Sequence, residues 1–164
     1  MSKYLQNIIF FIIVFFIVPV SLATTSFEYG MNAFQQENYV TAFRLWSPLA
    51  DQGDSLAQYN LGVMYYEGYG IPQNYSKAIE WFFKAAKQNN DEAQRNLGVM
   101  YYEGHGVPQS DVRAYMWFDL AASHGNGQGF LNRQMVAARM TPNQISEAQN
   151  LTRLWESNQN KRKR

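Results

Sequence analysis

Two carboxylates and two histidines are the residues of this sequence with the clearest capacity for chemistry. Glu67 and Glu103 occupy the same place in two nearly identical stretches, and paired carboxylates can serve as general acid and base or bind a cation. A nucleophile activated by an imidazole would need His105 or His124, the two histidines of the chain. We favour the simpler interpretation, in which the glutamates are solvated near helix ends about one helix pair apart and the histidines lie in a turn and at a helix end.

Other catalytic signatures are missing from the sequence. No serine is followed by a lysine three residues later, as a serine β-lactamase requires. The absence of cysteine excludes a disulfide scaffold, a thiolate zinc site and a cysteine nucleophile, and glycine-rich phosphate loops are absent. His105 is replaced by Tyr69 in the other copy of its stretch, so that position accepts either residue. We therefore expect no catalytic residue, no cofactor and no metal site.

Composition limits the remaining classes of function. The chain has 164 residues, 46% of them hydrophobic and 16% aromatic, which is enough for one domain with a packed core. Its formal net charge of +1 argues against a general nucleic-acid binder. Residues 158–164, which end in the basic run KRKR (161–164), are expected to form a frayed, solvated tail.

An internal repeat dominates the chain. Residues 61–74 read LGVMYYEGYGIPQN and residues 97–110 read LGVMYYEGHGVPQS, with eleven of fourteen positions identical at an offset of 36 residues. A period of this length is typical of a repeat array. Ala42, Ala78 and Ala114 follow the same offset, so the period covers a second element as well.

Each repeat unit is expected to be helix, loop, helix, because apolar residues recur at three- and four-residue spacing in both parts. Gly68 and Gly104 lie where the first helix of each unit should end in a left-handed C-cap. Gly62 and Gly98 lie within these helices, where glycine is less favourable than alanine by roughly 1 kcal/mol, which indicates a close approach of two helices. The pattern predicts an all-α protein with eight helices, over residues 27–36, 39–50, 54–66, 75–88, 91–102, 111–124, 127–139 and 142–157.

The two ends of the array depart from the repeat. The first unit lacks four loop residues, so Glu37 and Asn38 must make its bend. At the other end, Thr141 should cap a last helix that starts with Pro142. The predicted units are 27–53, 54–89, 90–125 and a diverged cap, 126–157, within a repeat domain over 24–157.

These motifs resemble the Sel-one-like repeat family, a relative of tetratricopeptide repeats. The family pattern of an alanine, then LGxxYxxGxGV, then a helix with spaced Ala and Trp residues occurs twice, around residues 57–86 and 93–125. The segment MTPNQISEAQNLTRLWE (140–156) is similar to the terminal helix of bacterial members. The shortened first unit departs from the pattern and looks closer to a plain tetratricopeptide repeat.

The resemblance implies a right-handed α-solenoid that binds other proteins. Exported bacterial members act as adaptors in envelope assembly, regulation or host contact, and this chain is expected to be such a non-catalytic adaptor. The alternative is an envelope hydrolase, either a β-lactamase-like or a peptidoglycan-acting enzyme, because some members have been linked to penicillin binding. The oligomeric state stays open, and self-assembly through the end repeats is a third possibility.

The resemblance also implies where a partner binds. In tetratricopeptide-like stacks the first helices line a concave face, which would hold a peptide or a helical segment of a partner protein. Aromatic side chains and arginine are the residue types that anchor such interfaces. Aligned on the glycines, the expected partner-binding residues are Phe27, Met31, Phe34, Tyr59, Val63, Tyr66, Glu67, Arg95, Val99, Tyr102 and Glu103.

Residues 1–23 have the features of a signal peptide. Lys3 precedes the apolar run 8–20, and Ser21 and Ala23 are small residues at −3 and −1 of a cut after Ala23. An uncleaved anchor is the alternative, but a spanning helix needs roughly 20 apolar residues and this run is shorter and contains Pro19. We expect an exported protein, periplasmic or secreted, with no membrane span after cleavage.

Cleavage after Ala23 would leave Thr24 as the first residue of the mature protein. Mass spectrometry of the exported product should therefore find Thr24, or a close neighbour, at the N-terminus. A membrane fraction that carries the chain with Met1 intact would contradict cleavage.

Overall fold

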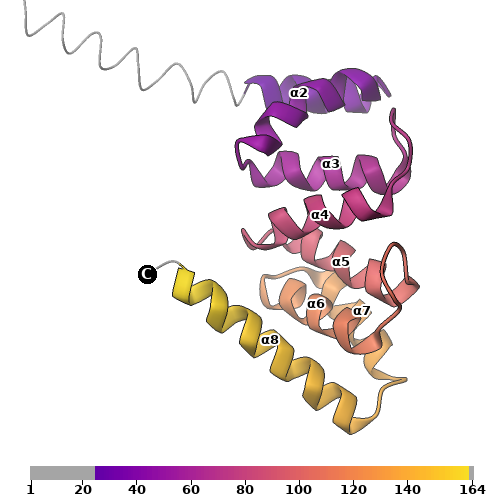
Figure 1. The fold of residues 1–164 in the computed structure, drawn as a ribbon, viewed down its shortest axis with the longest axis vertical. Helices are drawn as coiled ribbons and strands as arrows, with labels where there is room; N and C mark the ends of the chain where they lie inside the picture. The colour runs from indigo at the N-terminus through magenta and orange to yellow at the C-terminus, as the bar shows by residue number, and fades with distance from the viewer. Residues whose placement is uncertain (1–24, 163–164) are drawn as a thin grey trace, which may run out of the picture.

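The computed structural model describes residues 25–162, and every regular element among them is a helix (Figure 1). This confirms the all-α prediction, whereas the predicted signal peptide, 1–23, lies outside the described residues. None of the described helices has the length and apolar character to cross a membrane. After a first helix over 25–35, the elements are α2 (Tyr39–Asp51), α3 (Ser55–Glu67), α4 (Tyr75–Ala86), α5 (Asp91–Glu103), α6 (Asp111–Ser123), α7 (Gly127–Ala137) and α8 (Pro142–Arg162).

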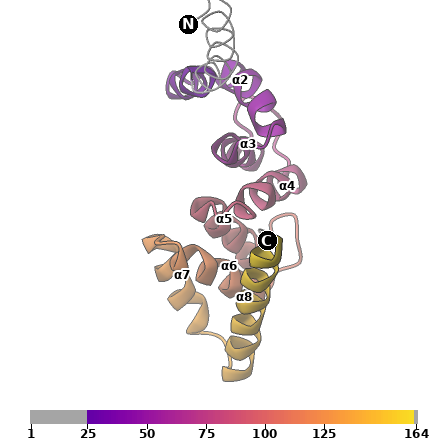
Figure 2. The ribbon, with the colours of Figure 1, turned by 90° about the vertical axis from the view of Figure 1, so that its left-hand side faces the viewer.

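The helices pair and stack in chain order, each packing on the next from α2 to α7. Figure 2 shows the helix over 25–35, α3, α5 and α7 along one side of the stack and α2, α4 and α6 along the other. We call the side formed by α3, α5 and α7 the first-helix face. The stack is the arrangement expected of helix–loop–helix units that cannot bury their apolar sides alone.

The loops follow the predicted capping. Gly68 and Gly104 end α3 and α5 in the left-handed conformation, with φ of 78° and 76°. The side chains of Asn74 and Ser110 cap α4 and α6 by accepting hydrogen bonds from backbone N–H groups three residues on. In the shortened first unit, Glu37 takes a positive φ of 59° and makes the predicted bend.

A glycine in each first helix lies against an aromatic ring of the second helix. A Cβ added to Gly62 would come 2.5 Å from Phe82 Cδ1, and one added to Gly98 would come 2.4 Å from Phe118 Cδ1. Both rings are 1% exposed. The predicted close approach of the helices at these glycines is therefore confirmed, and these rings form the centre of each unit.

The fourth unit does not repeat this contact. At the 36-residue offset, the places of Leu97 and Gly98 are taken by Arg133 and Gln134, and Arg133 forms an ion pair with Asp119 of α6. Gln134 is exposed, so this unit has no glycine–ring contact, and α8 packs along α6.

The last helix differs from its prediction in length. Thr141 and Gln144 cap its start reciprocally, as a Thr-Pro start indicates, and Trp155 packs against Phe83 and Trp117 with ring centroids 5.4 and 4.8 Å away. The helix continues to Arg162 rather than ending near residue 157. The described part of the predicted tail is thus helical, because no glycine or proline stops it.

The glycine–ring contact predicts the effect of one methyl group. Gly98→Ala should lower the free energy of unfolding, because overpacking in a core costs roughly 1–3 kcal/mol, more than the ~1 kcal/mol that alanine contributes to a helix. Gly127→Ala is the control, since nothing lies within 4 Å of its added Cβ, and it should be neutral or stabilising. Urea unfolding followed by circular dichroism measures both.

A second substitution tests the cause of the loss. Phe118→Leu costs stability by itself, but it removes the ring edge that the new methyl group meets. The double variant should therefore lose less than the sum of the two single variants. Additive losses would show that the ring is not what the methyl group strikes.

Candidate functional site

The first-helix face contains a hollow of about 280 Å³ between α3 and α5. Six of the sequence-predicted partner-binding residues meet around it, five of them half-buried and one, Glu67, exposed. The full lining is Tyr59, Val63, Tyr66, Glu67, Phe82, Arg95, Asn96 and Val99.

The wall of the hollow is aromatic and aliphatic. Tyr59 lies over Phe82 with ring centroids 6.0 Å apart, and Val63 and Val99 are half-buried beside them. Burial, and then the Glu92 carboxylate, raise the pKa of the Tyr59 phenol. The phenol therefore stays neutral at physiological pH and presents an apolar ring with a polar tip.

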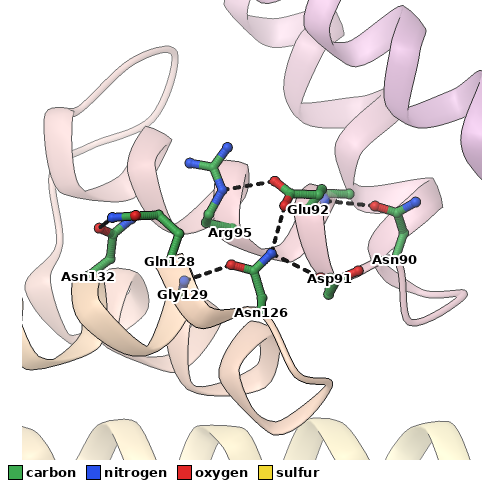
Figure 3. A network of polar contacts seen from close by, with 9 residues as sticks. Asn90, Asp91, Glu92, Arg95, Asn126, Gln128, Gly129 and Asn132 are labelled. Carbon is green, nitrogen blue, oxygen red and sulfur yellow. Dashed lines mark hydrogen bonds and ion pairs between the residues drawn. The ribbon is translucent and has the colours of Figure 1, made fainter.

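Arg95 is held at the rim by a polar network (Figure 3). Its Nε donates to Glu92 Oε2 at 3.0 Å. The other oxygen of Glu92 accepts from Asn126 Nδ2 at 2.9 Å, and Asn126 also donates to Asp91. Since Asn126 is buried and caps α7, the network ties the start of α7 to the start of α5 and fixes the direction of the guanidinium.

Tyr66, Glu103 and His105 form the second polar cluster of the face. Tyr66 Oη lies 2.9 Å from His105 Nδ1 and 3.2 Å from Glu103 Oε2, while His105 stacks on Tyr75 with ring centroids 4.6 Å apart. Burial, and then the Glu103 carboxylate, raise the pKa of the Tyr66 phenol well above its usual value of 10.0. A phenol held neutral in this way is a hydrogen-bond donor rather than a base.

The stacking of His105 on Tyr75 is a contact between units that recurs along the array. One unit earlier, Tyr69 stacks on Tyr39 with ring centroids 4.8 Å apart, and Gly70 lies close against Tyr39. The shared geometry supports the interpretation of His105 as a turn residue whose place either ring can fill. The Tyr66–Glu103–His105 cluster thus joins α3 to the loop that follows α5.

His124 also has a repeat-equivalent role. It ends α6, as predicted for a histidine at a helix end, and its Nδ1 lies 2.9 Å from Gln94 Oε1. One unit earlier, Gln88 donates to Gln58 Oε1 at the same distance. No group of three potential metal ligands occurs among residues 25–162, and the two histidines lie in different joints.

The other predicted partner-binding residues lie outside the hollow. Phe27, Met31 and Phe34 are half-buried against the cluster around Trp46, with ring centroids 5.9 Å from Trp46 for Phe27 and 5.5 Å for Phe34. Tyr102 lies beneath the guanidinium of Arg139, 4.2 Å from its ring centroid. Glu103 is turned toward Tyr66 and His105.

Two residues that continue the face were missed at the sequence level. Leu131 and Met135 of α7 follow Arg95 and Val99 at the 36-residue offset, and they are 55% and 49% exposed. The repeat offset alone could have found them, but the weak match of the fourth unit hid the correspondence. Phe82 and Asn96, which complete the hollow, were likewise not predicted.

Helix pairs stacked at a 36-residue period, with a glycine–ring contact repeated in the first three units, define an α-solenoid repeat protein. Comparison with protein-family models matches the Sel1 repeat three times, over residues 22–54, 55–90 and 91–126. These segments cover more than half of the chain, so the chain belongs to the Sel1 repeat family. The match includes the shortened first unit, which is therefore a Sel1 repeat as well.

Solved structures share the fold. A protective antigen present in uropathogenic Escherichia coli strains, which displays an SLR fold, is 31% identical with a TM-score of 0.77, over 81% of this chain and 29% of the antigen. A Sel1 repeat protein from Oxalobacter formigenes is 28% identical with a TM-score of 0.63, over 65% of this chain and 44% of that protein. This chain thus matches less than half the length of either. Comparison with curated proteins gives no match.

The raised pKa of Tyr66 predicts how stability depends on pH. The folded state keeps the phenol proton to higher pH than the unfolded state, so this contribution is complete below the unfolded value of about 10 and is lost as pH rises above it. From about pH 9 to about pH 11, wild-type protein should lose more stability than Tyr66→Phe. Tyr29→Phe, at an exposed position, is the control and should behave as wild type; an unchanged pH dependence in Tyr66→Phe would contradict the assignment.

Proposed function

We propose that this protein is an exported, non-catalytic adaptor that binds a segment of a partner protein, an extended peptide or a helix, on its first-helix face. The observation that carries the proposal is the hollow between α3 and α5, where six side chains indicated by the family resemblance meet. Sel1 repeats typically mediate interactions between proteins. The bacterial envelope or the cell exterior is the setting that the pattern of residues 1–23 supports.

The chemistry of the hollow suits binding better than catalysis. Its lining consists of three aromatic rings, two valines, one asparagine, one carboxylate and one guanidinium. Rigid aromatics beside arginine are the residues that contribute most at protein interfaces. The two glutamates that suggested acid–base chemistry have different surroundings, since Glu67 lines the hollow and Glu103 contacts His105.

A light-activated crosslinker at the site of Tyr59 tests the proposal in cells of the native source. Because the hollow is expected to hold the partner, this variant should give a discrete crosslinked protein that mass spectrometry identifies. The matched control carries the crosslinker at Val40, which is 67% exposed on α2 and lies away from the first-helix face. Val63→Ser with Val99→Ser should then abolish the adduct while the helical content stays unchanged.

Two results would contradict this function. Identical adducts from Tyr59 and Val40, or none from Tyr59, would exclude the hollow as the partner site. Turnover of a chromogenic β-lactam or of peptidoglycan by the purified chain would contradict the non-catalytic role and favour an envelope hydrolase.

A further inference from the structure

We propose that the hollow selects partner segments carrying an internal aspartate or glutamate next to a large apolar residue, with the carboxylate bound by Arg95. This inference rests on the proposed function and specifies the chemistry of the bound segment. It follows from the direction of one guanidinium, the charges at the rim and the apolar side chains on both sides of it.

The guanidinium of Arg95 is held in place by one hydrogen bond, and its other N–H donors remain free within the described part of the chain. Its Nε is bound to Glu92, while neither terminal nitrogen has a hydrogen-bond partner within residues 25–162. Figure 3 shows these two nitrogens pointing away from Glu92 and from the Asn126 network. A side chain held in this way retains two parallel N–H donors, the fork that matches a carboxylate, and little of its freedom is left to lose on binding.

The unused N–H donors of Arg95, rather than a net positive charge, favour an acidic group at this end, because Glu92 already pairs with the guanidinium. Arg95 is the sole cation among the described residues that line it, and its side chain is 24% exposed, so a bound carboxylate would be partly shielded from water. Glu67 lines the same hollow and is the last residue of α3, whereas Arg95 lies in the first half of α5. A second carboxylate placed there would be repelled, so the site favours one acid at one end rather than a run of acids.

Apolar side chains flank Arg95 on both sides. Tyr59 and Val63 precede it on α3, and Leu131 and Met135 follow it on α7. The latter pair are exposed large hydrophobic residues on the same face, and Leu131 stands at the repeat position of Arg95 itself. A segment lying across α3, α5 and α7 would therefore place apolar residues beside its acid.

Selection from a library of random peptides tests the preference on the full chain. Peptides recovered with wild-type protein should be enriched in Asp or Glu beside Leu, Ile, Met or Phe. Arg95→Gln should weaken the selected peptides by about tenfold or more, because a charge-assisted bidentate pair is lost. Arg44→Gln removes the same charge from an exposed position on α2 and should leave affinity within about twofold.

The salt dependence and a charge reversal give independent readouts. Added NaCl should weaken binding to wild-type protein and have little effect on Arg95→Gln, because an ion pair is screened. Arg95→Glu should replace the acidic preference with a preference for Lys or Arg. Circular dichroism of each variant checks that the fold is retained.

Several results would overturn the inference. Selected peptides without acidic enrichment, or with equal affinity for wild type and Arg95→Gln, would exclude the carboxylate while leaving the adaptor function standing. Binding that disappears when the peptide C-terminus is amidated would assign the site to a terminal carboxylate instead. If no peptide binds and the Tyr59 crosslinker also captures nothing, the proposed function fails, and this inference fails with it.

Discussion

The contact between a glycine of the first helix and an aromatic ring of its partner helix, repeated in the first three units, is the constraint on which the stack depends. Gly62 and Gly98 have no Cβ to hold Phe82 and Phe118 away, so the two helices of a unit approach until ring meets backbone. The ring is then fully buried although each unit is only two helices thick. Glycine lowers the intrinsic stability of each helix by roughly 1 kcal/mol, and burial of a phenylalanine side chain, at about 1.5–3 kcal/mol, more than offsets it.

The same contact explains where the array changes. Once Arg133 and Gln134 take the places of the core leucine and glycine, α7 offers a charged and bulky surface to any second helix of its own. The apolar side of α8 is buried in two places: Ala148 joins a core cluster with Phe118 of α6 and Val136 of α7, and Trp155 packs against Phe83 and Trp117. One consequence is that α8 covers α6. The other is an α7 whose Leu131 and Met135 remain exposed and extend the first-helix face beyond the hollow.

The parts of this fold that sequence could predict are those that depend on local or repeated patterns. Gly68 and Gly104 mark helix ends because the left-handed cap is a property of a few adjacent residues. Gly62 predicted a close approach of two helices because a residue unfavourable in a helix recurs there at the repeat offset. The helix against which α8 packs could not be predicted in this way. The amphipathic spacing of α8 shows that one side is buried, but it does not show which element covers that side. The contact of Arg139 with Tyr102 stands one repeat after the contact of Glu103 with Tyr66, but the change from a carboxylate to a guanidinium hid this correspondence in the sequence.

The repeated scaffold creates a problem of register that the unrepeated residues solve. If every unit presented the same side chains, a partner segment could bind shifted by one unit with similar affinity. The position that follows the 36-residue offset is instead Tyr59 in one unit, Arg95 in the next and Leu131 in the last. A single charge among apolar neighbours fixes the alignment of a bound chain, as one polar residue fixes the register of a coiled coil. Specificity can therefore reside in one outward residue per unit, while the glycine and its ring hold the first three units to one geometry.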